Sequence, residues 1–305
     1  MKVKVKTLEG ESKTEIVLPA QFEEELRPDL IKRAVLAIQS HKRQPYGSDP
    51  EAGKKYSAKL SRRRRDYKGA YGHGISRVPR KIMSHKGTRF NWQGATAPNT
   101  VGGRVAHPPK VEKIWDQKIN IKERRKAIRS ALSASVVKEL IVKRGHHVED
   151  YPLVIEDSFE DLMKAKQVVS VLVKLGLTKE LARSERKTRK SGIAARRGRP
   201  FKKAKGPLLV VSKKCNLINA ASNIPGIEII TVESLNAELL APGCDYGRLT
   251  IYTKGSIDKI GNEQLFTGIK SDVTKKPAAT QKVEKPKAEK PKTKTVKKVK
   301  SEVKK

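Results

Sequence analysis

The sequence contains little of what builds disulfides, metal sites or membrane spans. Two cysteines, Cys215 and Cys244, occur among 305 residues, too few for a disulfide framework and without zinc-ligand spacing. This cysteine usage fits a reducing compartment. No run of about 18 apolar residues is present, so no transmembrane helix is expected. The first residues alternate lysine and valine instead of forming a signal-peptide core, and we therefore expect a cytoplasmic protein.

Apolar residues are also scarce. Aromatic residues make up 5% of the chain and hydrophobic residues 36%. These fractions are low for a chain that folds throughout its length. Part of the sequence is therefore expected to have no core of its own.

Positive charge is what the chain has in excess. Its 68 lysines and arginines outnumber its 32 acidic residues, which gives a formal net charge of +36. A field of this strength repels itself and is tolerated beside a polyanion, so it indicates a nucleic-acid partner. An anionic membrane surface is the other polyanion to consider, but without a spanning or signal segment we expect no membrane partner.

The charge is concentrated in three segments. Residues 41–115 contain 18 lysines and arginines against four acidic residues, residues 183–206 contain 11 against one, and residues 271–305 contain 13 against four. The remainder is nearly neutral. We therefore divide the chain into an α/β globular body (1–40 and 116–268), an extended loop (41–115), a basic insertion within the body (183–206) and a disordered lysine-rich tail (269–305).

The body is expected to be α/β with a mainly parallel sheet, because apolar strand patterns alternate with helical ones. Asn120 with Glu123, and Asp157 with Glu160, have the spacing of helix-capping pairs. Expected strands lie near residues 3–5, 16–18, 152–155, 208–212, 227–231 and 249–253. Expected helices lie near residues 28–38, 120–132, 157–175, 216–223, 234–240 and 256–265.

Residues 41–115 are too long for an ordinary connection and hold nine glycines and six prolines. Their aliphatic residues show neither helical nor strand periodicity. Seven of the chain's fourteen aromatic residues nevertheless lie here, whereas disordered linkers are poor in aromatics. Arginines pair with phosphates and aromatic rings stack on unpaired bases. We interpret this segment as an RNA-binding arm, unstructured alone and ordered by RNA; a solvated linker is the alternative.

The other two basic segments have different settings. Residues 183–206 fall between a helix and the buried strand at 208–212 and are interrupted by glycines, so they are expected to emerge at a sheet end, a common place for sites. The tail repeats lysine with proline or alanine, which is typical of a disordered segment that binds polyanions without specificity. A flexible solubilising end is an equally good interpretation of it.

The residues predicted to bind RNA are basic or aromatic side chains of the arm and the insertion. They are Arg62, Arg63, Arg64, Arg65, Tyr67, Lys68, Arg77, Arg80, Lys81, Arg89, Trp92, Arg104, Lys110, Arg189, Lys190, Arg196, Arg197, Arg199, Lys202 and Lys203.

No catalytic constellation stands out. The run from Gly47 to Lys55 resembles a phosphate-binding loop but has one residue too many between its glycines and lacks the final Ser or Thr. His146 and His147 are adjacent, so they point apart on a helix or a strand. We expect no catalytic residue, no metal and no cofactor, and predict that the protein is not an enzyme. An RNA-modifying enzyme or assembly factor with a basic arm is the main alternative, and a chromatin-like DNA binder is another.

An ordered series of short motifs resembles the large-subunit ribosomal protein four family, in its archaeal and eukaryotic form. The similarity covers roughly residues 1–265, and the order of the motifs makes it specific. The chain is shorter than typical eukaryotic members, which favours the archaeal form. The motifs are Arg27-Pro-Asp-Leu-Ile-Lys-Arg-Ala-Val-Leu-Ala37, Gln44-Pro-Tyr-Gly47-Ser, Ala106-His-Pro-Pro-Lys110, Arg129-Ser-Ala-Leu-Ser-Ala134, Arg144-Gly-His146, Phe159-Glu-Asp-Leu162, Arg197-Gly-Arg199, Ala241-Pro-Gly243 and Gly247-Arg-Leu-Thr250.

The resemblance implies a Rossmann-like three-layer body on the large ribosomal subunit. It implies a structural role in which the protein binds large-subunit rRNA, supports subunit assembly and contacts neighbouring ribosomal proteins. It also implies that the extended loop enters the rRNA and that its tip, within residues 69–95, helps line the nascent-peptide exit tunnel. The tunnel-lining candidates are Gly72, His73, Gly74, Arg77, Arg80 and Lys81. The lysine-rich tail is not part of the common family core.

Overall fold

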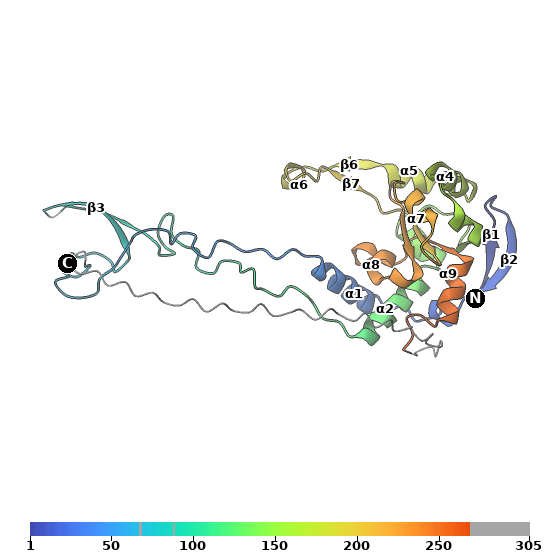
Figure 1. Ribbon diagram of the computed structural model, residues 1–305, viewed down its shortest axis with the longest axis horizontal. Coiled ribbons are helices and arrows are strands. Elements are labelled where there is room, and N and C mark those ends of the chain that lie inside the picture. Colours follow the sequence, from blue (N-terminus) through green and yellow to red (C-terminus); the bar gives the residue numbers. More distant parts are fainter. Residues whose placement is uncertain (67–68, 88, 269–305) are drawn as a thin grey trace, which may run out of the picture. The chain divides into compact units, whose positions relative to one another are not determined.

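The computed structural model describes residues 1–66, 69–87 and 89–268 (Figure 1). The predicted disordered tail at 269–305 lies outside the described residues, as do Tyr67 and Lys68 of the predicted RNA-binding set.

A six-stranded sheet forms the centre of the body, and its strand order is β2-β1-β5-β10-β8-β9. Four of its five strand pairings are parallel, and only β1 and β2 pair antiparallel. The predicted α/β class with a mainly parallel sheet is therefore confirmed. The strands are β1 (Lys2–Lys6), β2 (Ser12–Val17), β5 (Leu153–Ile155), β8 (Leu208–Val211), β9 (Glu228–Thr231) and β10 (Thr250–Thr253).

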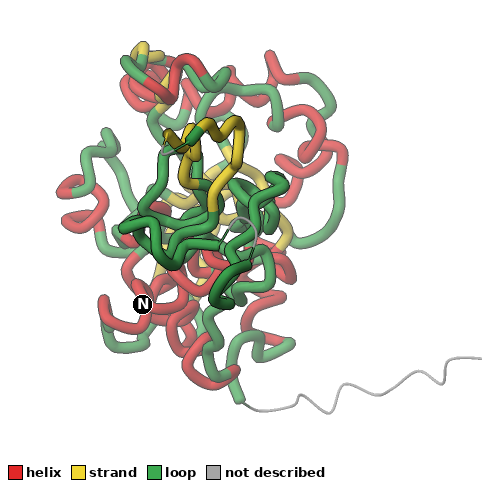
Figure 2. Tube along the Cα trace, turned by 90° about the vertical axis from the view of Figure 1, so that its left-hand side faces the viewer, coloured by secondary structure: helices red, strands yellow, loops and turns green. Residues whose placement is uncertain are grey.

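Helices cover both faces of this sheet, which is why its central strands are apolar without alternation. Val154, Val210 and Tyr252 point to one face and belong to a buried cluster with residues of α1, α2, α8 and α9. Their chain neighbours point to the other face, against α3, α4 and α7. Figure 2 draws the helices in red and the strands in yellow. The helices are α1 (Pro28–His41), α2 (Ile121–Ala134), α3 (Lys138–Lys143), α4 (Ala165–Lys174), α5 (Thr178–Glu185), α6 (Ile193–Arg196), α7 (Asn216–Ala221), α8 (Ala237–Leu240) and α9 (Lys254–Asn262).

Two predicted helices begin where the sequence indicated. Pro28 starts α1 with its φ already set for a helix, and Ile31, Ala34 and Val35 are buried at helical spacing. Asn120 occupies the N-cap position of α2, but its side chain accepts no capping hydrogen bond. Glu123 does not complete a capping box either; its carboxylate accepts from Arg33 Nη1 at 3.3 Å.

The predicted helix over 157–175 is wrong in its first half. Residues Asp157–Asp161 form a 3₁₀ turn, and α4 begins only at Ala165. Glu160, expected to cap a helix, is buried and accepts hydrogen bonds from the backbone and hydroxyl of Ser212 and from the Thr253 hydroxyl, at 2.7 to 2.8 Å. Its carboxylate therefore joins the carboxyl ends of β8 and β10. Asp157 accepts from Gly255 N, in the first turn of a different helix, α9.

Several short elements were not predicted. Helices α3 and α5 are absent from the predicted set, and the expected helix over 234–240 is a 3₁₀ turn, Val232–Ser234, followed by the four-residue α8. Other 3₁₀ turns are Ala20–Phe22 and Pro242–Cys244. Two hairpins lie in the basic segments: β3 (Arg80–Lys86) with β4 (Arg89–Gly94), and β6 (Lys187–Arg189) with β7 (Phe201–Lys203).

Candidate nucleic-acid interface

The arm, residues 41–115, consists of an outgoing and a returning leg that contact each other repeatedly. Ser48 N donates to Pro109 O at 3.2 Å, and Lys59 forms an antiparallel bridge with Arg80. Lys81 Nζ lies 3.4 Å from the centre of the Tyr56 ring. These contacts give the arm a fixed internal register along much of its length.

The neck, residues 40–46 and 113–117, closes the arm with a cluster of aromatic and cationic side chains. Tyr46 and Trp115 stack with ring centres 5.5 Å apart. The Arg43 guanidinium lies 3.7 Å and the Lys113 ammonium 4.2 Å from the centre of the Trp115 ring. The backbone N–H of Gln117 also donates to Ser40 Oγ at 3.0 Å. The electron-rich indole face thus holds two cations together where they would otherwise repel.

Replacing Trp115 with alanine is expected to loosen the neck without unfolding the body. Aromatic stacking and a cation–π contact contribute about 0.5–1.5 and 0.5–1 kcal/mol respectively. Their loss should speed hydrogen exchange of the Gln117 and Ser48 amides by about tenfold, with the melting temperature of the body unchanged. Hydrogen-exchange mass spectrometry measures both. Ile114→Ala is the matched control, because Ile114 is 85% exposed; equal exchange in the two variants would contradict the role given to Trp115.

Two glycines bring the legs into contact beyond the neck. A Cβ on Gly47 would lie 2.6 Å from the Val111 side chain, and one on Gly53 would lie about 2.4 to 2.5 Å from the Gly103 and Arg104 backbones. Gly53 also has φ +73°, which favours glycine. The glycines of the rejected phosphate-loop pattern therefore have a structural explanation: they permit close backbone packing.

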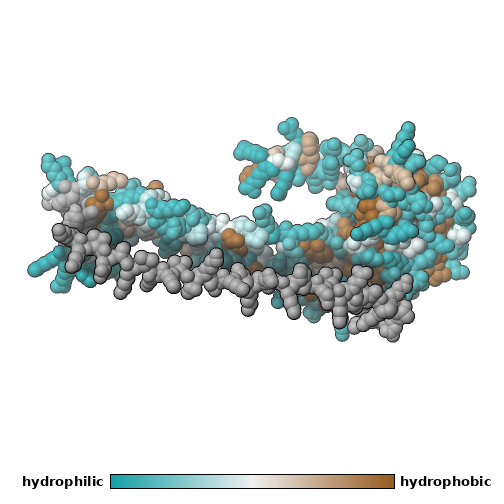
Figure 3. All heavy atoms as spheres, viewed as in Figure 1, coloured by the Kyte–Doolittle hydropathy of each residue, from teal (hydrophilic) through white to brown (hydrophobic). Residues whose placement is uncertain are grey.

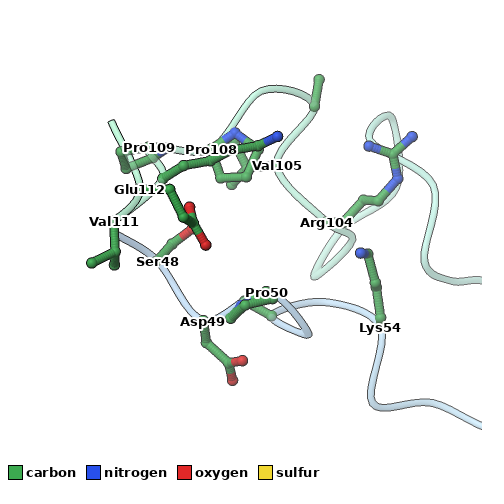
Figure 4. Close-up of a pocket in the computed structure, with 13 residues that line it drawn as sticks. Ser48, Asp49, Pro50, Lys54, Arg104, Val105, Pro108, Pro109, Val111 and Glu112 are labelled. Atoms are coloured by element: carbon green, nitrogen blue, oxygen red, sulfur yellow. The ribbon is translucent and has the colours of Figure 1, made fainter. Parts of the chain in front are cut away.

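A cavity lies between these two close approaches (Figure 4). Its volume is about 550 Å³. The residues that line it are Ser48, Asp49, Pro50, Ala52, Lys54, Arg104, Val105, Ala106, Pro108, Pro109, Lys110, Val111 and Glu112. Prolines supply much of its apolar wall, whereas Lys54 and Arg104 stand together on one side of it and Glu112 and Ser48 on another. Arg104 and Lys110 are among the residues predicted from the sequence to bind RNA, whereas no pattern in the sequence indicates the cavity.

Beyond the cavity, the arm contains a hairpin that the sequence analysis missed. Strands β3 and β4 pair antiparallel, with Ile82 opposite Trp92 and an irregularity between Ile82 and Ser84. Ile82 and Trp92 are only half-buried, beside Leu60, Ala70 and Val78. Polar and charged residues otherwise dominate both strands, so they show no apolar alternation. The ladder continues one residue further through Ala95 N, which donates to Pro79 O at 2.9 Å, and Lys59 of the outgoing leg forms a bridge with Arg80 of β3.

The four consecutive arginines, Arg62 to Arg65, lie in an exposed turn before this hairpin. The turn is held by the Ser61 hydroxyl, which hydrogen-bonds to the Asp66 carboxylate, and by Gly69 N, which donates to Asp66 O at 3.1 Å. None of the four guanidinium groups forms an ion pair or hydrogen bond with a residue of the described ranges. They are therefore available to pair with phosphates.

Other predicted arm residues are partly engaged within the arm. Arg80 donates to the carbonyls of Ser76 and Val78, at 2.6 and 3.1 Å, and Lys81 covers the Tyr56 ring. These side chains brace the arm's own loop, a role that the sequence analysis did not foresee. By contrast, Arg77, Arg89 and Lys110 are exposed.

The loop proposed to face a tunnel lies between the arginine turn and β3. Gly72, His73, Gly74 and Arg77 are all exposed there. The His73 ring meets Trp92 edge-on, with centres 6.1 Å apart. This contact joins the exposed loop to β4.

The second basic hairpin, β6–β7, brings positively charged side chains close to one another. Lys187 lies directly opposite Lys203, and all six of its strand residues are exposed. Like charges in direct cross-strand pairs are destabilising. Figure 3 shows the hydrophilic surface of both basic elements in teal. The predicted residues here, whose side chains make no ion pair with other described residues, are Arg189, Lys190, Arg196, Arg197, Arg199, Lys202 and Lys203.

A buried polar network fixes the base of this hairpin. Glu180 is fully buried in α5 and accepts from Arg183 Nε and Nη2 at 2.9 and 2.7 Å. Its Oε1 also lies 2.7 Å from Nδ1 of His146, which is 3% exposed, and its Oε2 accepts from His147 N. Arg183 Nη2 then donates to Lys205 O at 2.7 Å. The network therefore links α5 to Lys205, two residues after the end of the hairpin.

The ionisation of this network follows from its burial and its partners. Burial by itself raises the pKa of Glu180, but the hydrogen bonds from Arg183 and His146 outweigh it and lower that pKa to about 2. Burial lowers the pKa of His146, against the opposing hydrogen bond to Glu180. Both lowered pKa values agree with a neutral His146 imidazole that donates Nδ1–H to an ionised Glu180 carboxylate. As expected, His147 points elsewhere and is exposed.

No group of three or more His, Cys, Asp or Glu side chains in the described ranges could hold a metal ion. No helix of residues 1–66, 69–87 or 89–268 is long and apolar enough to cross a bilayer.

The sequence is similar to those of known proteins over most of its length. The sequence model of the "Ribosomal protein L4/L1 family" matches residues 16–263. The chain is 47% identical over 267 residues to the large ribosomal subunit protein uL4 of Nanoarchaeum equitans, covering 87% of this chain and 100% of the relative. It is 44% identical over 263 residues to the uL4 proteins of Archaeoglobus fulgidus and Methanocaldococcus jannaschii, covering 86% and 85% of this chain and 98% of each relative.

Proposed function

Because this chain belongs to the ribosomal protein L4/L1 family, in its archaeal form, we propose that it is a structural constituent of the large ribosomal subunit. It acts as a non-enzymatic, cytoplasmic rRNA-binding protein with neighbouring ribosomal proteins as further partners. The family match over residues 16–263, most of the globular body and the whole arm, carries this conclusion.

The distribution of charge supports rRNA as the ligand. The arm and the β6–β7 hairpin contain exposed cations that lack acidic partners among the described residues, and in the hairpin two lysines face each other. Phosphates would neutralise these side chains and release counterions, which is the main source of affinity for nucleic acids. The arm's braced turns reduce the conformational entropy lost on binding.

The division of labour follows the predicted domains. The Rossmann-like body, residues 1–40 and 116–268, docks on the subunit, and the arm and the insertion at 183–206 bind rRNA and support assembly. The arm's loop and hairpin, within residues 69–95, form part of the exit-tunnel wall and meet the nascent peptide there. Support for the tunnel role comes from the family resemblance and from the exposure of Gly72 to Gly74 and Arg77.

Sedimentation tests the proposal. In a sucrose gradient of cell lysate, the chain is expected to co-migrate with large subunits and whole ribosomes, and to stay with them at high salt because many contacts act together. A small-subunit protein and a known salt-released factor serve as controls in the same gradient.

The alternative classes predict different profiles. A free pool, or release at moderate salt, would favour an RNA-modifying enzyme, an assembly factor or a non-specific polyanion binder. Equal binding to duplex DNA and structured RNA by the purified chain would favour a DNA-binding protein.

A further inference from the structure

The cavity between the legs of the arm has the features of a binding site instead of a packing defect. Its ends are fixed by the close approaches of Gly47 to Val111 and of Gly53 to Gly103. Between them, Ser48 N donates to Pro109 O, and the Asp49 carboxylate accepts from Glu51 N at 3.0 Å and pairs with Lys55 at 2.6 Å. These bonds hold the outgoing leg in a turn, so the cavity of about 550 Å³ is preformed. This volume lies within the usual range for small-ligand sites, about 300–1,000 Å³.

The wall chemistry suits one flat, partly apolar group with an anion attached. Pro50, Pro108 and Pro109 present apolar ring surfaces. Lys54 and Arg104 lie together on one side of the cavity (Figure 4), and neither side chain forms an ion pair within the described part of the chain. A guanidinium plane can stack on a base, and an ammonium can meet its phosphate.

One acidic side chain in the wall adds selectivity. The Glu112 carboxylate points into the cavity beside Ser48 (Figure 4) and has no hydrogen-bond or ion-pair partner among residues 1–66, 69–87 and 89–268. A carboxylate accepts hydrogen bonds but donates none, so it favours a ligand edge that carries N–H groups. In nucleic acids the exocyclic amino group of cytosine is such an edge. Uracil offers a carbonyl oxygen at the same position, which a carboxylate repels.

We propose that this cavity binds one unpaired nucleotide of an RNA, with an amino-bearing base held between the prolines and Glu112 and its phosphate facing Lys54 and Arg104. The inference rests on the proposed function for the identity of the polymer. A peptide segment without acidic residues is a poorer occupant, because it brings no negative charge to balance Lys54 and Arg104.

The test compares two ribo-oligonucleotides that differ at one functional group of the base. Full-length chain is titrated by fluorescence anisotropy into labelled oligocytidylate and oligouridylate of equal length at fixed salt. The chain is expected to bind oligocytidylate about tenfold more tightly. Glu112→Gln should reduce this ratio to about one, since an amide can serve either base. Its binding of oligouridylate should not weaken.

A matched variant separates selectivity from charge. Glu51→Gln removes the same charge from the same arm, but Glu51 does not line the cavity, so its tenfold preference should remain. Equal ratios for the two variants, or no preference in the unmodified chain, would overturn the proposal. Circular dichroism of both variants establishes that the fold is retained.

A second readout identifies the occupant in the assembled particle. A photo-reactive benzophenone side chain replacing Ala106, which lines the cavity, is expected to crosslink to rRNA in purified large subunits. A crosslink to protein would refute a nucleotide occupant while leaving the ribosomal role intact. If the chain did not sediment with large subunits at all, the proposed function itself would fail, so the two failures are distinguishable.

Discussion

Replacing Glu180 with glutamine is expected to lower the free energy of unfolding by about 3–5 kcal/mol, because removing one partner of a buried ion pair leaves the other uncompensated. Glu180 is fully buried and accepts hydrogen bonds from Arg183, from the His147 backbone and at His146 Nδ1. An amide accepts through only one oxygen and brings an N–H₂ group toward Arg183. The change is therefore both electrostatic and geometric.

Urea denaturation of the RNA-free chain measures this change, with Glu185→Gln as the matched control on the same helix. Glu185 is exposed, so its substitution should alter stability by less than about 0.5 kcal/mol. If Glu180→Gln fell within the same limit, the network would contribute nothing to the fold. A loss of stability with an unchanged denaturant slope would show that the body still unfolds in one step.

The pH dependence of stability supplies an independent check on this network. The folded pKa of Glu180, about 2, lies below its ordinary value of 4.5, so its contribution is present above about pH 4.5 and is lost as the pH falls toward 2. The pKa of His146 is also lowered. Because the unfolded histidine then binds a proton first, stability falls as the pH drops below 6.5. Glu180→Gln should show a smaller decline between pH 4.5 and 2, because it lacks the part that Glu180 contributes.

Replacing Arg62, Arg63, Arg64 and Arg65 together with glutamine is expected to weaken rRNA binding by two orders of magnitude or more at about 0.1 M salt. Each phosphate contact contributes about 0.7–0.9 to the slope of log affinity against log salt concentration. Four lost contacts should therefore reduce that slope by roughly three. Filter binding of the full chain to large-subunit rRNA across a salt series gives both quantities.

The control for this variant must change net charge equally. Four exposed lysines of the body meet this need, and their replacement by glutamine should reduce the slope by less than one contact. Equal loss in the two variants would mean that total charge, and not the arginine turn, governs binding. The control residues are Lys2, Lys4, Lys13 and Lys32.

The elements of the body were predicted well because buried strands and helix faces need apolar residues at fixed spacing or in continuous runs. The run at 208–211 is a fully buried strand, as its apolar composition indicated. Glu160 was misread for the opposite reason. Its spacing from Asp157 matched a capping pair, whereas its true partners, Ser212 and Thr253, lie 52 and 93 residues away in the chain. Local patterns cannot report such long-range bonds.

Of the candidate site, only the location in the chain could be predicted, from the local amino-acid composition. Charge and aromatic content located the arm, but its hairpin buries little apolar surface, with Ile82 and Trp92 only half-buried, and so shows no hydrophobic period. The pairing of Lys81 with Tyr56 and of Gly53 with Gly103 depends on the register of the two legs. Trp115, which stacks on Tyr46 where the two legs meet at the neck, was only one aromatic among seven in the sequence of the arm.

The neck has a consequence for how the arm can evolve. It joins residues near Tyr46 to residues near Trp115, and so closes a loop of chain whose closure entropy grows only logarithmically with length. Doubling that loop would cost about 0.6 kcal/mol, less than a single aromatic contact can contribute. Insertions and deletions beyond the neck should therefore have little effect on the free energy of unfolding of the body. The length of the arm can then evolve under selection for ligand binding without a matching change in the body.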